Sequence, residues 1–486
     1  MNDALYDAFK AHDARFDGRV FICVSSTGIY CRPVCRVKTP KKENCAFHMS
    51  AASAEAAGYR PCRKCRPELA PGLAPTDSGS RLARKAALAM DADCLRDSCL
   101  VELADMFGVS DRHLRRVFSD EFGVPPVQYL QTRRLLLAKN LLTDTELSVT
   151  KIAMASGFGS VRRFNHLFTT RYKFSPTELR RHSQKKQVRD ESGVTVHIGY
   201  RPPYRWDALS AFLAGRSIPG VECVENGAYM RTVVVPDGGG RVCRGWISVA
   251  RAEKKNALAV TVPSSLVPVL PKVLGRVRNL FDTDCEPETV YAALSVMNEM
   301  RPGLCVPGTR LPGCFDAFEM AVRAVLGQQI TVKAARTLAG RFARAFGEAI
   351  ETPHAALTHN FPTPETVLAL PGTVESHLGP LGIIGARARS IAALAEAMAS
   401  GKVNLSPLAD PEEEMEKLQA LPGFGPWTAR YIAMRSLSWP DAFPHTDYGV
   451  KKALDDMPAA KMLALAEQWR PWRSYATINL WNSLST

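Results

Sequence analysis

The sequence predicts a multidomain α+β protein, with a small α/β domain, an all-α domain, a mixed α+β subdomain and a second all-α domain in that order. Its 486 residues exceed the roughly 250–300 residues at which one hydrophobic core usually stops growing. Two segments, 68–80 with its Pro, Gly and Ser and the basic run 182–189, lack apolar periodicity and are expected to be boundaries. Between them the periodicity is helical, and beyond them it alternates as in strands before it becomes helical again.

The boundaries divide the chain into four segments. These are 1–75, 81–186, 193–286 and 287–486. In the third segment, three stretches alternate apolar and polar residues as strands do. They are 194–198, 229–235 and 257–262, and a helical stretch lies at 206–214. The fourth segment is helical with Gly-Pro punctuation, so we expect the last two segments to form one unit of two subdomains.

Positive charge is concentrated in the N-terminal part of the chain. Within a net charge of +14, residues 1–190 hold 32 basic against 20 acidic side chains, whereas residues 191–486 hold 30 against 28. A basic balance of this kind favours binding to a polyanion such as nucleic acid. The alternative is a charged surface that only aids solubility.

The composition favours an intracellular protein. No apolar run reaches the roughly 18 residues needed to span a bilayer, and the N-terminal stretch is charged and unlike a signal peptide. We therefore expect a cytoplasmic protein without a membrane partner. In that reducing compartment, the 13 cysteines are expected to be buried thiols, metal ligands or reactive groups rather than disulfides.

Four cysteines have the spacing of a zinc site. Cys31 and Cys35 form a C-x3-C pair, and Cys62 and Cys65 form a C-x2-C pair after a gap of 26 residues. Thiolates at this spacing suit tetrahedral zinc. Spacing alone favours a purely structural zinc site, although the neighbouring basic residues also give the thiols an electropositive setting.

The sequence around these cysteines resembles the N-terminal domain of Ada-type methylation-response proteins. The matching strings are TGIYCRPVC at 27–35 and GYRPCRKC at 58–65. The resemblance implies one zinc ion that stabilises the fold and activates a nucleophile, and it implies that Cys31 accepts a methyl group from a methyl phosphotriester in DNA. A zinc-bound thiolate stays ionised at neutral pH, and its methylation reduces the repulsion between the domain and DNA.

Two helix-turn-helix patterns follow. VELADMFGVSDRHLRRVF at 101–118 has Gly108 at the turn and Ser110 as the cap of the next helix, and VTKIAMASGFGSVRRFNHLF at 149–168 has Gly157 at its turn. For a single copy, an amphipathic bundle with a solvated basic face is an equal alternative. The candidate DNA-binding residues on the two second helices are Arg112, Arg115, Arg116, Arg162, Arg163 and Asn165.

The paired motifs resemble the AraC/XylS family of transcription regulators. The string GFGSVRRFNHLFTTRYKFSPTELRR at 157–181 is the strongest part of this resemblance. It implies sequence-specific binding to promoter DNA, with RNA polymerase as a further partner.

A helix-hairpin-helix pattern lies near the C-terminus, in LPGFGPWTA at 421–429. Its glycines, Gly423 and Gly425, permit a tight turn that directs backbone N–H groups at a DNA phosphate. Asp447 follows 18 residues later in PHTDYGVKK. The combination resembles the helix-hairpin-helix DNA glycosylases, and the simpler interpretation of Asp447, a helix N-cap, is compatible with catalysis because a cap also orients the carboxylate.

The C-terminal half more closely resembles the AlkA-type 3-methyladenine glycosylases, over essentially all of 193–486. The matching strings are RPPYRWDALSAFLAGRSIPGVE at 201–222, RPGLCVPGTRLPGCFDAFEMAVRAVLGQQIT at 301–331 and WRPWRSYATINLW at 469–481. The resemblance implies that Asp447 is the catalytic carboxylate and that a flipped base stacks on aromatic side chains. The aromatic candidates are Trp427, Tyr431 and Trp481, for which core packing is an equal alternative, and the candidates for the side chain that enters the duplex are Gln329 and Ile330.

Two absences narrow the expected chemistry. Glycosylases of this superfamily that also cut the strand carry a lysine where this chain has Trp427, so we expect hydrolysis without lyase activity. No cysteine follows Cys314, so we expect no iron–sulfur cluster of the kind that some relatives carry after the catalytic aspartate.

The expected protein is a fusion of a small zinc-binding α/β domain, an all-α double helix-turn-helix domain, a mixed α+β subdomain and an all-α helix-hairpin-helix glycosylase domain. We expect a monomeric, nucleoid-associated protein that binds double-stranded DNA, both alkylated DNA and promoter DNA. Its activities would be monofunctional excision of alkylated bases such as 3-methyladenine and a single-turnover methyl transfer. The alternative is a methylation-responsive activator whose glycosylase half binds DNA without catalysis.

Overall fold

The computed structural model describes residues 2–13, 16–17, 20–48, 51–65, 67, 78–92, 99–183, 193–237, 240–253 and 255–484. They form two compact units, Met1–Met90 with Arg96–Thr132 and Asp91–Leu95 with Arg133–Thr486. The predicted boundary segments 68–80 and 182–189 lie mostly outside the described residues, although the last three residues of the first already belong to a helix. No described helix is long and apolar enough to cross a membrane.

The first unit begins with a four-stranded sheet in the order β3-β1-β2-β4. β1 is buried at all four positions and pairs with β2 and β3 in antiparallel fashion, while β2 and β4 are parallel. One hydrophobic cluster against this sheet consists of the buried residues Phe21, Cys23, Tyr30 and Ala54. The elements are α1 (Asn2–Lys10), β1 (Phe21–Val24), β2 (Ile29–Cys31), η2 (Lys42–Asn44), β3 (Cys45–His48), α2 (Ala51–Ala56) and β4 (Arg60–Pro61).

An all-helical region follows and includes residues of both units, and its fourth helix, α6, continues from one unit into the other. Its elements are α3 (Ser78–Ala92), α4 (Cys99–Met106), α5 (Asp111–Phe122), α6 (Pro126–Asp144), α7 (Val149–Ala155), α8 (Val161–Tyr172) and α9 (Pro176–Ser183). The residues predicted at the turns adopt the expected conformation, because Gly108 and Gly157 have positive φ angles of 62° and 82°. Ser110 and Ser160 cap α5 and α8 through hydrogen bonds from backbone N–H groups.

The second unit contains a five-stranded antiparallel sheet in the order β5-β9-β8-β7-β6. The elements of this part are β5 (Val194–Gly199), α10 (Trp206–Ala214), β6 (Glu222–Glu225), β7 (Ala228–Pro236), β8 (Val242–Arg251), β9 (Ala257–Val262), η5 (Ser264–Val269) and α11 (Leu270–Phe281). Three of the strands and α10 were predicted, whereas β6 and β8 were not. In β8, Gly245 interrupts the apolar alternation because a Cβ there would lie 2.9 Å from Leu266 in η5.

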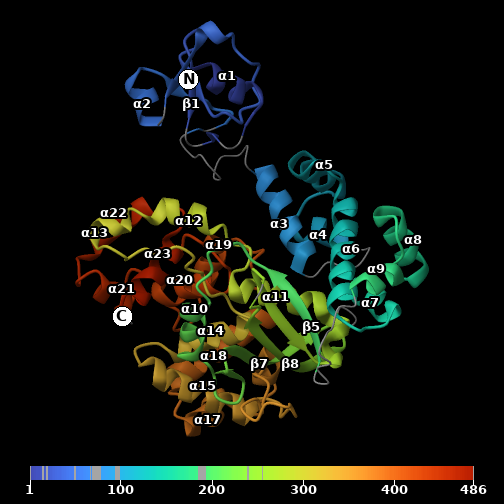
Figure 1. Cartoon of the computed structure of the whole chain (residues 1–486). Coiled ribbons are helices and arrows are strands. Elements are labelled where there is room, and N and C mark those ends of the chain that lie inside the picture. The colour runs from blue at the N-terminus through green and yellow to red at the C-terminus, as the bar shows by residue number, and fades with distance from the viewer. Residues whose placement is uncertain are drawn as a thin grey trace. The chain divides into compact units, whose positions relative to one another are not determined.

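The rest of the second unit is helical (yellow to red in Figure 1). Its elements are α12 (Pro287–Leu294), α13 (Met297–Met300), α14 (Ala317–Leu326), α15 (Val332–Phe346), α16 (Pro364–Leu368), α17 (Val374–Leu378), η6 (Gly379–Leu381), α18 (Gly385–Ala399), α19 (Pro411–Gln419), α20 (Pro426–Arg435), α21 (Tyr448–Ala453), α22 (Ala459–Ala466), η7 (Glu467–Trp469) and α23 (Arg473–Asn482). α14 is the central helix, because eight of its ten residues are buried. The predicted multidomain α+β fold class is therefore confirmed.

Candidate active site and metal centre

The four predicted zinc ligands come together in the first unit. Their sulfur atoms all lie within 4.8 Å of one another, and all four side chains are buried. The parallel pairing of β2 with β4 explains this convergence: Tyr30 is opposite Pro61, so Cys31 and Cys62, the next residues on each strand, are brought side by side. The backbone N–H of Arg32 also points to Cys65 Sγ at 3.5 Å.

The thiols are too close together to behave independently. Hydrogen bonds with Cys35 and Cys65, together with burial, raise the pKa of Cys31 far above its usual range, while the hydrogen bond from Cys31 lowers the pKa of Cys35 to about 4. Sharing of protons in this way is expected of a thiol cluster, in which a divalent cation replaces the protons and stabilises the thiolates. The residues present therefore fit zinc.

Basic side chains surround the cluster in two different ways. Arg32 is 1% exposed and donates from Nε to Asp17 Oδ1 at 2.8 Å, so its charge is paired in the interior. Arg36, Arg63 and Lys64 are exposed. The first arginine stabilises the loop between the two ligands Cys31 and Cys35. The other three charges lie at the surface, where Arg36 is 3.9 Å from Asp120 and Lys64 donates to the carbonyl of Arg36 at 2.7 Å.

The predicted DNA-binding side chains of the helix-turn-helix copies lie on α5 and α8. Arg112, Arg115, Arg116, Arg162, Arg163 and Asn165 are all exposed. The opposite faces of the two helices are buried, with Leu114 and Phe118 on α5 and Phe164 and Phe168 on α8 each 0% exposed. Each second helix is therefore amphipathic, with its basic side chains pointing away from the core.

The helix-hairpin-helix is formed by α19, α20 and the hairpin between them. Gly423 is exposed and has φ of 81°, and a Cβ there would lie 2.1 Å from Ser390 Oγ, so only glycine fits without a shift. Gly425 is the N-cap of α20 and has open space around its Cα. Both predicted glycines therefore lie where the first backbone N–H groups of α20 face outward.

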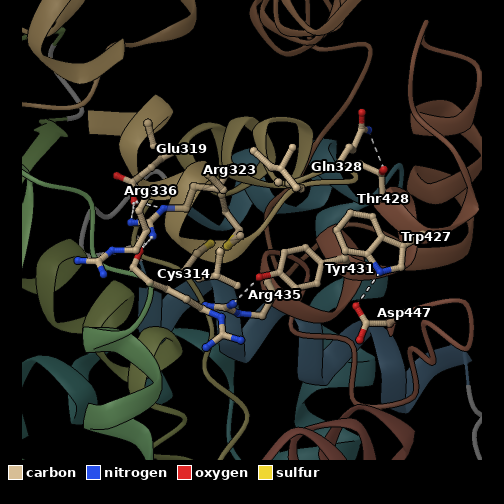
Figure 2. A pocket seen from close by; sticks show the side chains of 18 of the residues that line it. Cys314, Glu319, Arg323, Gln328, Arg336, Trp427, Thr428, Tyr431, Arg435 and Asp447 are labelled. Atoms are coloured by element: carbon tan, nitrogen blue, oxygen red, sulfur yellow. Dashed lines mark hydrogen bonds and ion pairs between the residues drawn. The ribbon is translucent and has the colours of Figure 1, made fainter. Parts of the chain in front are cut away.

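Asp447 is the N-cap of α21 and accepts three hydrogen bonds. Trp427 Nε1 donates to Oδ2 at 3.0 Å (Figure 2). Trp481 Nε1 donates to Oδ1 at 2.9 Å, and the backbone N–H of Val450 donates to Oδ1 at 3.1 Å. The donors come from α23, α20 and α21. The carboxylate is therefore fixed in one orientation by three separate helices, and it remains half-buried.

Asp447 lines a cavity of about 1150 Å³, together with the three predicted aromatic residues. Trp427 and Tyr431 are one turn apart on α20 and stack with ring centroids 5.3 Å apart and planes at 10° (Figure 2). Trp481 lies 6.2 Å from Tyr431 and is also stacked on Phe212 of α10 at 6.2 Å. The cavity is large enough for a small heteroaromatic ring and has flat aromatic walls.

Gln329 and Ile330 lie on the loop between α14 and α15, at the edge of the same cavity. Gln329 is exposed and has φ of 55°, whereas Ile330 is half-buried. Their neighbour Gln328 is held by hydrogen bonds from its Nε2 to Gly423 O at 2.8 Å and to Thr428 Oγ1 at 3.0 Å (Figure 2). This loop is therefore tied to the helix-hairpin-helix, and Gln329 is exposed on it.

Several residues of the cavity wall carry no sequence signal of their own. Arg216 and Arg435 belong to this group, as do the buried ion pairs of Glu222 and Glu319 with Arg231 and Arg323. Although burial opposes it, Arg323 and Arg231 hold the pKa of Glu222 at about 2. These residues come from a loop, two strands and two helices, so no spacing rule could have grouped them.

Comparison with known proteins gives four matches along the chain. Residues 4–68 match the metal binding domain of Ada, and residues 103–182 match a helix-turn-helix domain. Residues 195–316 match the AlkA N-terminal domain, and residues 322–468 match the HhH-GPD superfamily base excision DNA repair protein. The matches follow the chain order that the sequence predicts, and they identify the four-cysteine cluster as a zinc-binding site.

Relatives cover the whole chain or one half of it. A probable bifunctional transcriptional activator/DNA repair enzyme AlkA of Mycobacterium tuberculosis is 36% identical over 99% of this chain and 96% of its own length. DNA-3-methyladenine glycosylase 2 of Escherichia coli is 35% identical over 58% of this chain and 95% of its own length. The bifunctional transcriptional activator/DNA repair enzyme AdaA of Bacillus subtilis is 29% identical over 39% of this chain and 87% of its own length. The chain belongs to the family of AlkA-type bifunctional transcriptional activator/DNA repair proteins.

Proposed function

We propose that this protein repairs alkylated DNA and regulates the response to it. In this proposal, residues 287–486 together with 193–286 form a monofunctional DNA-3-methyladenine glycosylase, residues 1–75 form a zinc-dependent methyl acceptor, and residues 81–186 bind promoter DNA. The observation that carries the first activity is the Asp447 carboxylate, held by two indole N–H groups at 2.9 and 3.0 Å on the edge of an aromatic cavity. The names of two relatives, a probable bifunctional transcriptional activator/DNA repair enzyme and a DNA-3-methyladenine glycosylase, support this combination of activities.

The geometry favours a dissociative hydrolysis at C1′ of the nucleotide. As the C1′–N bond breaks, the alkylated base leaves with the bonding electrons and the sugar gains positive charge. A fixed carboxylate such as Asp447 stabilises that charge in the transition state more than it stabilises the ground state. Water then adds its oxygen to C1′, and the proton it loses can pass to the carboxylate. Trp427, Tyr431 and Trp481 would stack on the base while it is outside the duplex.

The loop at the cavity edge fits the role of the duplex-entering element. We assign Gln329 rather than Ile330 to the gap left by the flipped base, because Gln329 is exposed and has a positive φ whereas Ile330 is half-buried. The N–H groups of the hairpin at Gly423 and Gly425 would bind a phosphate of the same strand.

In the first unit, Cys31 would be the methyl acceptor. Zinc supplies an ionised and still nucleophilic thiolate at neutral pH when it is bound. Attack of Cys31 Sγ on the methyl carbon of a phosphotriester forms an S–CH3 bond, breaks the O–CH3 bond and leaves a phosphodiester, so each chain reacts once. Mass spectrometry after incubation with methylated DNA should place one methyl group on Cys31, and a methyl group on Cys62 or Cys65 would overturn this assignment.

The exposed basic faces of α5 and α8 support DNA binding by the helix-turn-helix region. We propose that methyl transfer at Cys31 strengthens this binding, since one negative charge facing DNA is removed. In this proposal the protein binds the promoter as a monomer and recruits RNA polymerase there.

One experiment separates this function from its alternative, an activator with a non-catalytic glycosylase half. The wild-type protein and Asp447→Asn are incubated with methylated duplex DNA, and free base and strand breaks are measured separately. We expect the wild-type protein to release free base without cleaving the strand. Asp447→Asn should not release the base. Binding without release by the wild-type protein would favour the non-catalytic alternative.

A further inference from the structure

Arg216 places a positive charge among the aromatic rings of the base cavity. It follows α10, and its guanidinium carbon lies 3.8 Å from the ring centroid of Phe212 and 5.9 Å from that of Trp481. Both distances are in the range of cation–π interactions. The side chain is half-buried and lines the same cavity as Asp447.

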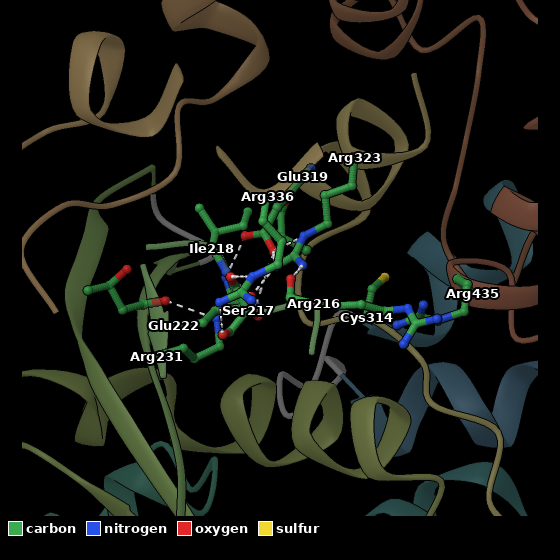
Figure 3. Close-up of polar contacts among 12 residues, drawn as sticks. Arg216, Ser217, Ile218, Glu222, Arg231, Cys314, Glu319, Arg323, Arg336 and Arg435 are labelled. Atoms are coloured by element: carbon green, nitrogen blue, oxygen red, sulfur yellow. Dashed lines mark hydrogen bonds and ion pairs between the residues drawn. The ribbon is translucent and has the colours of Figure 1, made fainter. Parts of the chain in front are cut away.

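The backbone that carries Arg216 is held by charged side chains (Figure 3). Arg323 Nη1 donates to the carbonyl of Arg216 at 2.8 Å, and Arg336 Nε donates to the carbonyl of Ser217 at 2.9 Å. The N–H of Ile218 donates to Glu222 Oε2 at 3.0 Å. Three consecutive residues are thus fixed by a buried network, so the position of Arg216 is determined before any ligand binds.

A second arginine at the cavity is already occupied by the protein. Arg435 donates to the carbonyls of Pro312 and Gly313 at 2.5 and 3.1 Å and to the Tyr431 hydroxyl at 2.9 Å. Arg216 donates to the carbonyl of Phe212 at a longer 3.4 Å and also interacts with the Tyr431 side chain, but it is not bound to a pair of backbone carbonyls as Arg435 is. Of the two guanidinium groups, Arg216 therefore has more donor capacity left for a ligand.

The electrostatic setting of Arg216 is that of a cation near the reacting centre. Burial lowers its pKa and Arg435 adds to that effect, while Tyr431 and Asp447 oppose it. An arginine in such a setting stays protonated at neutral pH. Arg216 and Arg435 each carry a positive charge near the single negative charge of Asp447. These three groups therefore do not favour a ligand that is itself positively charged.

We propose that Arg216 is a specificity-determining residue that donates a hydrogen bond to the acceptor edge of a neutral flipped base and disfavours a base that carries a positive charge. The inference rests on the proposed glycosylase function and refines its substrate class. Neutral damaged bases with a ring carbonyl gain a charge-assisted hydrogen bond. Permanently cationic bases are excised chiefly because they are good leaving groups, and Arg216 reduces that advantage.

The test compares two duplexes, one with hypoxanthine, which is neutral, and one with 7-methylguanine, which is cationic in DNA. Both bases carry a ring carbonyl at C6, and they differ in charge, in the 7-methyl group and in the 2-amino group, so each variant is compared with the wild-type protein on the same duplex. For the wild-type protein and Arg216→Met, kcat and KM for base release are measured on each duplex, and affinities are measured in the Asp447→Asn background. Methionine keeps an apolar stem against Phe212, and thermal unfolding checks the fold.

Arg216→Met is expected to lower kcat/KM on hypoxanthine by about tenfold and to leave 7-methylguanine within about threefold, because the lost hydrogen bond is offset there by relief of charge repulsion. Arg216→Lys keeps the charge and should keep the low relative activity on 7-methylguanine. Arg251→Met removes an exposed charge at the end of β8, away from the cavity, and should change neither value.

An equal effect of Arg216→Met on both duplexes would reduce Arg216 to a packing residue and overturn the inference while leaving the glycosylase function intact. If Arg216→Lys changed kcat/KM on the two duplexes in the same way as Arg216→Met, the positive charge would not be the cause of the discrimination between the two bases. If the wild-type protein releases neither base nor methylated adenine, the proposed function itself fails, and the inference fails with it.

Discussion

The zinc cluster and the base cavity bring chemistry together in opposite ways. The four cysteines lie within 35 residues of one another in sequence and rest on a sheet of four strands, none longer than four residues. The residues that line the cavity are spread along the chain from Leu213 to beyond Trp481, and they rest on the extensive core of the second unit. A small domain obtains its order from a metal ion, whereas a large one can fix a carboxylate with ordinary hydrogen bonds.

This difference also bears on turnover. A metal-bound thiolate that takes a methyl group forms a stable S–C bond, so its chemistry ends after one event. A carboxylate that only stabilises charge is unchanged after the reaction and can act again. The two centres should therefore respond differently to metal removal and to substitutions. Metal removal should have the largest effect, and substitution of a single glycine the smallest.

Metal removal should separate the two centres most strongly. Chelation of zinc, or Cys65→Ser, is expected to unfold the N-terminal domain and abolish methyl acceptance, because structural zinc contributes on the order of 10 kcal/mol to the folding of small domains. Base release should persist. Metal analysis and both activities are measured on the full chain, with Cys45→Ser, a thiol outside the cluster, as the control. Loss of base release together with methyl acceptance would show that the two centres are not independent.

Asp447→Asn should have the largest effect in the cavity. Loss of one preorganised charge typically costs about 10²–10³ in rate, and asparagine keeps the size and most hydrogen bonds of the carboxylate. Single-turnover base release should fall by that factor while lesion binding and thermal stability stay near wild type. Asp410→Asn is the matched control, since Asp410 is also a helix N-cap but lies outside the cavity. Release near the wild-type rate in Asp447→Asn would mean that another group is the catalyst.

Trp481 contributes both a ring and an N–H group, and two variants separate them. Trp481→Ala should weaken lesion binding by about 1–3 kcal/mol through lost stacking and should also lower the rate. Trp481→Phe keeps an aromatic ring but removes the donor to Asp447, so it should lower the rate with little change in binding. Equilibrium binding and single-turnover release are compared. Equal binding by all three proteins would show that Trp481 does not stack on the base.

The two hairpin glycines should differ although they are two residues apart. Gly423→Ala introduces a positive φ in a non-glycine residue and a contact with Ser390, so it should destabilise the protein by about 1–2 kcal/mol and weaken DNA binding. Gly425→Ala has open space and an ordinary φ of −81°, so its stability should stay near wild type. Thermal unfolding and binding to undamaged duplex test this. The same loss in both variants would show that conformation at Gly423 is not the cause.

The sequence could specify those features that local chemistry controls. Cysteine spacing predicts a zinc site, the glycines of the two helix-turn-helix copies predict turns, Ser110 predicts a cap, and apolar alternation predicts β5, β7 and β9. It did not predict β6 or β8, because a short strand and a strand interrupted by Gly245 lack clean alternation. Propensity and periodicity act over a few residues, so they identify elements better than their assembly.

Sequence alone also determined that Asp447 precedes a helix that it can cap, and that aromatic residues are spaced one turn apart at Trp427 and Tyr431. Only the tertiary structure decided that indoles from two different helices hold that carboxylate, and that Arg216 lies over Phe212 beside it. The physical reason is that these groups come from different helices and from distant parts of the chain, as Arg216 and Trp481 do, 265 positions apart. Their energies depend on packing of whole helices against a shared core, which no local pattern encodes.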